Sequence, residues 1–185
     1  MHRISIKIDS PRPDYVKEMA EVAGLFFDAP ALTDGEADLC VLHTEQLAEG
    51  QRRCDIRLSG CLNGEHSNTQ ISMADPLVDK RLHKRQVKLA LYHALKQATG
   101  QHPPWGSLTG IRPTRLIYEA LGEGLTLNRA CARMMDVFDL RPESAVLLAV
   151  VVDTQRRLPQ AQPDDVDIYI GIPFCPSRCR YCSFI

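Results

Sequence analysis

Residues 166–182 read VDIYIGIPFCPSRCRYC, an apolar run that leads into three closely spaced cysteines. The run Val166–Ile172 has the length and hydrophobicity of a buried strand. Cys175, Cys179 and Cys182 follow it in the pattern C-x3-C-x2-C. The stretch therefore predicts a strand that leads into a loop carrying three thiols.

Three thiolates in a short loop can hold one face of an inorganic centre. Thiolate is a soft ligand that suits zinc and iron–sulfur clusters, and three thiolates would satisfy three of the four irons of a [4Fe–4S] cube. The fourth iron would stay open to a substrate or cofactor. A structural zinc site wants four protein ligands, and no histidine follows His102. A redox pair of Cys179 and Cys182 would leave Cys175 unexplained. The spacing favours iron–sulfur, with zinc and a redox pair as the alternatives.

The sequence around the cysteines resembles the cluster loop of the radical S-adenosylmethionine (SAM) superfamily, in which C-x3-C-x2-C is the defining pattern. It is most similar to the branch related to the oxygen-independent coproporphyrinogen III oxidases. Upstream, PWGSLTGIRPTRL at Pro104–Leu116 resembles the stretch that marks the HemZ-type coproporphyrinogen dehydrogenases. Two positions depart from the better-known oxidases: Gly171 stands where they carry histidine, and Phe184 where they carry a further cysteine. The matching positions are Tyr169, Ile172, Pro173, Phe174, Cys175, Cys179, Tyr181 and Cys182.

The resemblance implies a radical SAM oxidoreductase of haem and porphyrin biosynthesis. A flavodoxin- or ferredoxin-like donor would supply an electron that cleaves SAM to methionine and a 5′-deoxyadenosyl radical. The radical would start the oxidative decarboxylation of a propionate to a vinyl group on a porphyrinogen-type substrate. The cofactors would be a [4Fe–4S] cluster and SAM. The implied cluster ligands are Cys175, Cys179 and Cys182, and the implied cofactor-binding residues are Tyr169, Phe174 and Tyr181.

The rest of the chain predicts an α+β N-terminal domain, a small sheet plus helices, over residues 1–160. Within it, 1–70 would be α+β and 75–158 helical. The resemblance implies that residues 164–185 are the first strand and cluster loop of a truncated radical SAM partial (β/α) barrel. The chain would then be an N-terminal fragment, inactive alone. The predicted strands are Ile4–Ile8, Asp38–His43 and Arg53–Leu58, and the predicted helices are 14–27, 75–98, 113–120, 127–138 and 142–156.

Two motifs in the N-terminal domain allow alternatives. The basic run KRLHKRQVK at Lys80–Lys88 could contact nucleic acid or porphyrinogen carboxylates, but a solvated helix face is favoured because no aromatic residues interleave it. In GSLTGIRPTR, Arg112 and Arg115 could hold a carboxylate. Otherwise the stretch is a loop-to-helix junction, with Pro113 in the first helical turn and Thr109 or Thr114 as a cap.

Composition excludes some classes of function. The formal net charge is −1, so nucleic acid is not an expected partner. The longest apolar run, Ala145–Val152, is far shorter than the ~20 residues of a membrane span. The start lacks a signal-peptide core, which favours the cytoplasm, where thiols stay reduced.

The alternatives to the porphyrinogen oxidase are a haem-binding or haem-delivery protein that keeps the cysteine loop, and a radical SAM enzyme that acts on RNA.

Overall fold

The computed structural model describes residues 4–158, 164, 166, 168–172, 174–175 and 177. Its elements are, in chain order, β1 (Ser5–Asp9), the 3-10 helix η1 (Pro13–Tyr15), α1 (Val16–Ala23), β2 (Ala31–Leu32), β3 (Leu39–Ala48), β4 (Gln51–Gly60), β5 (Gly64–Ile71), α2 (Pro76–Thr99), α3 (Pro113–Gly122), α4 (Leu127–Phe138) and α5 (Pro142–Arg157). The strands form one mixed sheet in the order β2-β1-β3-β4-β5. β1 runs parallel to β2 and β3, while β3, β4 and β5 form an antiparallel meander.

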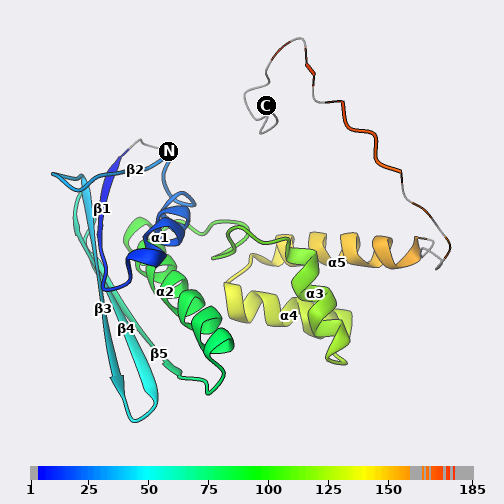
Figure 1. Cartoon of the computed structure of the whole chain (residues 1–185), viewed down its shortest axis with the longest axis horizontal. Helices are drawn as coiled ribbons and strands as arrows, with labels where there is room; N and C mark the ends of the chain where they lie inside the picture. The colour runs from blue at the N-terminus through cyan, green and yellow to red at the C-terminus, as the bar shows by residue number, and fades with distance from the viewer. Residues whose placement is uncertain are drawn as a thin grey trace.

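The first hydrophobic core lies between this sheet and the helices α1 and α2, which cover one of its faces (Figure 1). Side chains alternate along β3 and β4, so that one face points at the helices and the other is more exposed. From α2, Val87, Leu91 and Leu95 recur at helical spacing and are fully buried. Burial of each such side chain contributes about 1.5–3 kcal/mol. α2 therefore belongs to the same core as the sheet.

A second hydrophobic core is formed by α3, α4, α5 and the loop before α3. Ile117 of α3, Met134 of α4, and Leu148 and Val152 of α5 are at most 3% exposed. Pro113 and Pro142 stand at the starts of α3 and α5, where a missing N–H costs no helical hydrogen bond. None of the helices in the described part of the chain has the length and apolarity to cross a membrane.

The predicted elements within residues 4–158 are largely confirmed, with three corrections. The predicted helix 14–27 is too long, because α1 ends at Ala23 and Phe26 reaches the core from the following turn. β2 and β5 were not predicted. β5 reads GEHSNTQI, which lacks apolar alternation, and it contacts α2 through hydrogen bonds instead. The Asn68 side chain donates to the Gln86 carbonyl oxygen at 3.0 Å, and the Gln86 side chain donates to the Asn68 carbonyl oxygen at 3.2 Å.

The segment predicted as the first barrel strand, Val166–Ile172, is not in a strand at its described residues, 166 and 168–172. Ile168, Tyr169 and Ile170 are between 80% and 89% exposed. A strand that is apolar on both faces needs neighbouring strands, and none of the strands in the described residues pairs with this segment. The strand prediction is therefore wrong for these residues, and the barrel stays a prediction.

Candidate functional site

The cysteine loop lies only partly within the described residues. Cys175 is exposed and forms no disulfide. Tyr169 and Phe174 are also exposed, while Cys179, Tyr181 and Cys182 lie outside the described residues. Within the described residues, no group of three histidine, cysteine or acidic side chains is arranged to hold a metal ion. An accessible, unbridged thiol at Cys175 fits a soft-metal ligand.

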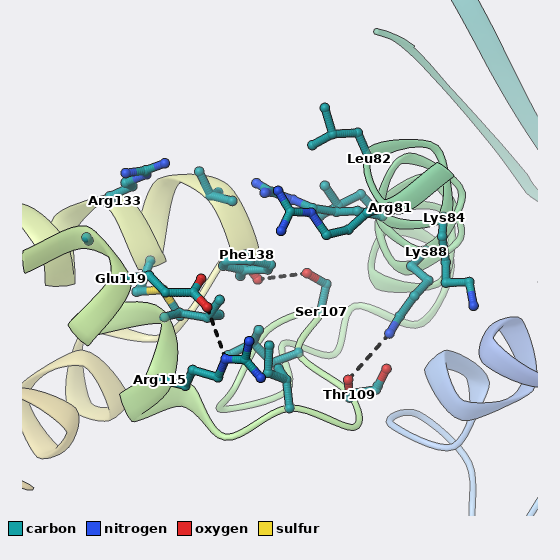
Figure 2. Close-up of a pocket in the computed structure, with 18 of the residues that line it drawn as sticks. Arg81, Leu82, Lys84, Lys88, Ser107, Thr109, Arg115, Glu119, Arg133 and Phe138 are labelled. Carbon is teal, nitrogen blue, oxygen red and sulfur yellow. Dashed lines mark hydrogen bonds and ion pairs between the residues drawn. The ribbon is translucent and has the colours of Figure 1, made fainter. Parts of the chain in front are cut away.

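A second candidate site is a cavity of about 480 Å³ between α2 and the pair α3 and α4. Its floor is the loop that contains Ser107, Leu108 and Thr109 (Figure 2). We call it the basic pocket. It brings together the two N-terminal motifs of the sequence, because the run Lys80–Lys88 supplies one wall and the loop before α3 supplies the floor. Its charged lining residues are Arg81, Lys84, Arg85, Lys88, Arg115, Glu119, Glu123 and Arg133.

Two of these cations sit in a partly apolar environment. The Arg85 guanidinium carbon lies 4.5 Å from the centre of the Phe138 ring. Burial, and repulsion from Arg133 and Arg81, lower the pKa of Arg85. Burial also lowers the pKa of Lys88, and attraction to the glutamates of α1 opposes this shift. Both side chains are half-buried, so the solvated-face interpretation of Lys80–Lys88 is wrong for these two residues.

The loop under the pocket is held by hydrogen bonds to the end of α4. The Ser107 N–H and hydroxyl donate to the Phe138 carbonyl oxygen at 2.8 and 3.2 Å. The Arg141 N–H donates to the Pro104 carbonyl oxygen at 3.1 Å. Gly106, between them, has a φ of 56°, in the left-handed region. These hydrogen bonds anchor the loop to the end of α4.

The loop leads into α3 largely as predicted. Pro113 stands in the first turn, which confirms the junction interpretation. The predicted threonine cap is wrong, because Arg112 is the N-cap residue and no side chain caps this helix. Arg115 lines the pocket and forms an ion pair with Glu119 at 3.0 Å, whereas Arg112 does not line it.

Asp139 joins the two cores beside the pocket. Its carboxylate accepts hydrogen bonds from the Tyr92 hydroxyl at 2.8 Å and the Lys96 ammonium at 2.6 Å, both on α2. The His102 Nε2 lies 3.3 Å from the same carboxylate oxygen. Burial raises the pKa of Asp139, but the bonds from Lys96 and Tyr92 outweigh it and the net pKa is lowered. Asp139 also ends α4 in the left-handed conformation, with φ 58°.

We expect Asp139→Asn to lower the free energy of unfolding by about 1 kcal/mol, because a partly exposed charged hydrogen-bond network is weakened while asparagine still suits the left-handed end of α4. Asp139→Ala should cost about 1 kcal/mol more, since alanine resists that conformation. Urea unfolding measures both. Asp136→Asn is the control: this exposed carboxylate of α4 has no ion pair within the described residues. Equal losses in Asp136→Asn and Asp139→Asn would contradict the role of Asp139 in joining the cores.

A polar cluster lies at one end of the first core. The Nε2 atoms of His43 and His83 lie 3.2 and 2.5 Å from the same Glu45 oxygen. The His43 Nδ1 is 2.8 Å from the Ser10 hydroxyl. Burial lowers the pKa of both imidazoles, although Glu45 opposes the shift. The folded chain thus favours neutral imidazoles here.

The chain should lose stability as the pH falls through 6.5. Burial lowers the pKa of His43, His66, His83 and His93 below the ordinary value of 6.5. The unfolded chain therefore binds more protons just below pH 6.5, so the free energy of unfolding rises with pH in that window. The free energy of unfolding in urea, measured between pH 7.5 and 5.5, tests this prediction, because an ordinary histidine titrates in that range. His93→Gln should flatten the slope, and a slope of the opposite sign would refute the assignment.

No protein-family model matches the chain. Among curated proteins, the oxygen-independent coproporphyrinogen-III oxidase-like protein HemZ of Bacillus subtilis (strain 168) is 33% identical over 195 residues, which cover 98% of this chain and 38% of that protein. The chain therefore spans about two fifths of the length of the curated relative that it matches. This similarity extends over nearly the whole of the 185-residue chain. Over nearly its whole length, the chain is thus similar to part of an oxygen-independent coproporphyrinogen-III oxidase-like protein of the HemZ type.

Proposed function

We propose that this chain is the N-terminal part of a radical SAM oxidoreductase that converts propionate groups of coproporphyrinogen III, or of a related porphyrinogen, to vinyl groups. The observation that carries the proposal is the C-x3-C-x2-C motif in a chain similar to a coproporphyrinogen-III oxidase-like protein. When bound, a [4Fe–4S] cluster and SAM would supply one-electron radical chemistry. Electrons would come from a flavodoxin- or ferredoxin-like donor in the cytoplasm.

The residues of this chain would bind and shield the cofactors. Cys175, Cys179 and Cys182 would be deprotonated to thiolates and hold the cluster. Phe174 and Tyr169 are 84% and 89% exposed, so each has most of its ring available to cover a cofactor. Tyr181 would play the same part. Burial of such rings against the cofactor would exclude water from the radical chemistry.

The alternative of a haem-delivery protein is less well supported, because the stretch LTGIRPT at Leu108–Thr114 resembles the HemZ-type proteins. For an RNA-directed enzyme, the run Lys80–Lys88 would be the contact surface. However, Lys80 and Lys84 form ion pairs with Asp14 and Glu18, and His83 is buried. The porphyrinogen oxidase is therefore the proposal that we favour.

The test is anaerobic iron–sulfur reconstitution of the longer protein that contains this chain, followed by SAM cleavage with and without coproporphyrinogen III. We expect vinyl products, and 5′-deoxyadenosine whose formation depends on the porphyrinogen. Formation of 5′-deoxyadenosine without that dependence would remove the substrate assignment. Stoichiometric retention of haem without vinyl products would favour haem delivery.

A further inference from the structure

The basic pocket has more positive charge than its own acids balance. Six of its lining residues are cationic and two are acidic. Arg115 pairs with Glu119, Arg133 with Glu123, and Lys84 with Glu18 outside the pocket. The other three cations, Arg81, Arg85 and Lys88, form no ion pair within the part of the chain that the structure describes. A cluster of cations without ion-pair partners in a concave site attracts anions.

The floor of the pocket holds an unused hydrogen-bond donor. The Thr109 hydroxyl oxygen is buried and has no hydrogen-bond partner among the described residues. The Thr109 carbonyl oxygen lies 3.5 Å from the Lys88 ammonium, so the same residue stands next to one of the three cations (Figure 2). A buried polar group without a partner costs stability in the free chain. A ligand oxygen that accepts from this hydroxyl would remove that cost.

The remaining walls of the pocket are apolar. The Phe138 ring lies under the Arg85 guanidinium, and the apolar lining includes Leu82 and Leu89 of α2, Leu116 of α3 and Met134 of α4. The volume of about 480 Å³ is in the ordinary range for sites that bind drug-sized molecules. The occupant should therefore combine several negative groups with an apolar body.

We propose that the basic pocket binds an organic polycarboxylate with an apolar framework, whose carboxylates are held by Arg81, Arg85 and Lys88 and by the Thr109 hydroxyl. Guanidinium groups match carboxylates in a two-bond geometry. The same groups also match phosphates, so the donors alone do not select the anion. The apolar walls favour a polycarboxylate with an apolar body over a small inorganic anion.

A porphyrinogen with propionate groups around a tetrapyrrole ring meets this description. That identification rests on the proposed function, whereas the site itself rests on the pocket alone. The basic pocket would then hold or deliver the substrate at a place separate from the cysteine loop. Binding can be measured without the iron–sulfur cluster, so it is independent of catalysis.

The probe is coproporphyrin III, the stable fluorescent tetracarboxylate, titrated into the 185-residue chain. We expect saturable binding that weakens as salt rises, because the contacts are ionic. Arg85→Gln should weaken binding about tenfold, since a charged hydrogen-bonding group is lost. Lys80→Gln is the matched control: it removes one charge from an exposed residue next to Arg81 that does not line the pocket, and binding should stay within about twofold.

Thr109→Val separates binding from folding. Removal of an unpartnered hydroxyl should leave the free energy of unfolding in urea unchanged or higher, while coproporphyrin III binding weakens about fivefold.

Equal affinities of Arg85→Gln and Lys80→Gln for coproporphyrin III would overturn the proposal, as would pyrophosphate that displaces the porphyrin at equal concentration. If this chain binds coproporphyrin III tightly but the longer protein forms no vinyl product, the proposed pocket ligand is supported and the proposed function is rejected. If the longer protein converts the porphyrinogen but the basic pocket binds no coproporphyrin III, the proposed function is supported and the proposed pocket ligand is rejected.

Discussion

Alanine in place of Cys175, Cys179 or Cys182 is expected to abolish the four-iron absorption of the anaerobically reconstituted longer protein and its cleavage of SAM. The proposed cluster has three protein ligands, so each substitution leaves two. Loss of an outer partner of a metal site already costs about 10–100-fold in affinity or activity. Each single variant should therefore lose at least about 100-fold in 5′-deoxyadenosine formation, because a direct ligand contributes more than an outer partner.

Two other cysteines provide the control and exclude a substitute ligand. Cys61 is exposed and unbridged, so Cys61→Ala removes an accessible thiol away from the motif and should leave the cluster intact. Cys54 is fully buried, and burial raises its pKa to about 12. Its thiol is therefore protonated at neutral pH and a poor metal ligand. A triple variant of the motif that kept the full four-iron signature would rule out the proposed function.

The sequence predicted best those elements whose apolar pattern is local. α4 coincides with the predicted 127–138, and α2 agrees with the predicted 75–98 to within one residue at each end. β5 escaped prediction because its attachment to α2 is polar and depends on Asn68 meeting Gln86. Hydrophobic periodicity carries no signal for such a contact.

The basic pocket escaped prediction for a different reason. The run Lys80–Lys88 and the stretch Pro104–Leu116 both stand out as motifs, but their meeting depends on how the second core docks against α2. Asp139 fixes that docking through Tyr92 and Lys96, and nothing in the local sequence identifies these three as partners. The sequence predicts the charge of each wall of the pocket. It does not predict that the two walls enclose a cavity.

Gly106→Ala should be the most damaging single substitution in the second core. A Cβ atom at this position would lie 1.9 Å from the Phe138 carbonyl oxygen and 2.6 Å from the Asp139 carbonyl carbon. These are backbone atoms at the end of α4, so relief requires the loop or the helix end to move. We expect the free energy of unfolding to fall by about 3 kcal/mol or more, a loss typical of combined backbone strain and overpacking.

Substitutions at two other glycines separate the cost of the atomic clash from the cost of the left-handed conformation. Gly100 has a similar φ of 67°, but a Cβ atom added there would have no neighbouring atom within 4 Å, so Gly100→Ala should cost only the left-handed conformation, about 1 kcal/mol. Gly122 has neither feature, and Gly122→Ala should be neutral or stabilise α3 by about 0.5–1 kcal/mol. Urea unfolding of the three variants gives the comparison. Equal losses at 106 and 100 would show that the contact with Phe138 is not made.

Gly106→Ala should also disturb the basic pocket. Gly106 allows Ser107 to donate twice to the Phe138 carbonyl oxygen, and this places Thr109 beside Lys88. If alanine displaces the loop, coproporphyrin III binding should weaken in Gly106→Ala at temperatures where the variant is still folded. Gly100→Ala, at the far end of α2, should bind normally. Loss of affinity in both would indicate a general loosening of the chain, whereas loss in Gly106→Ala alone ties the pocket to the close approach of this loop to α4.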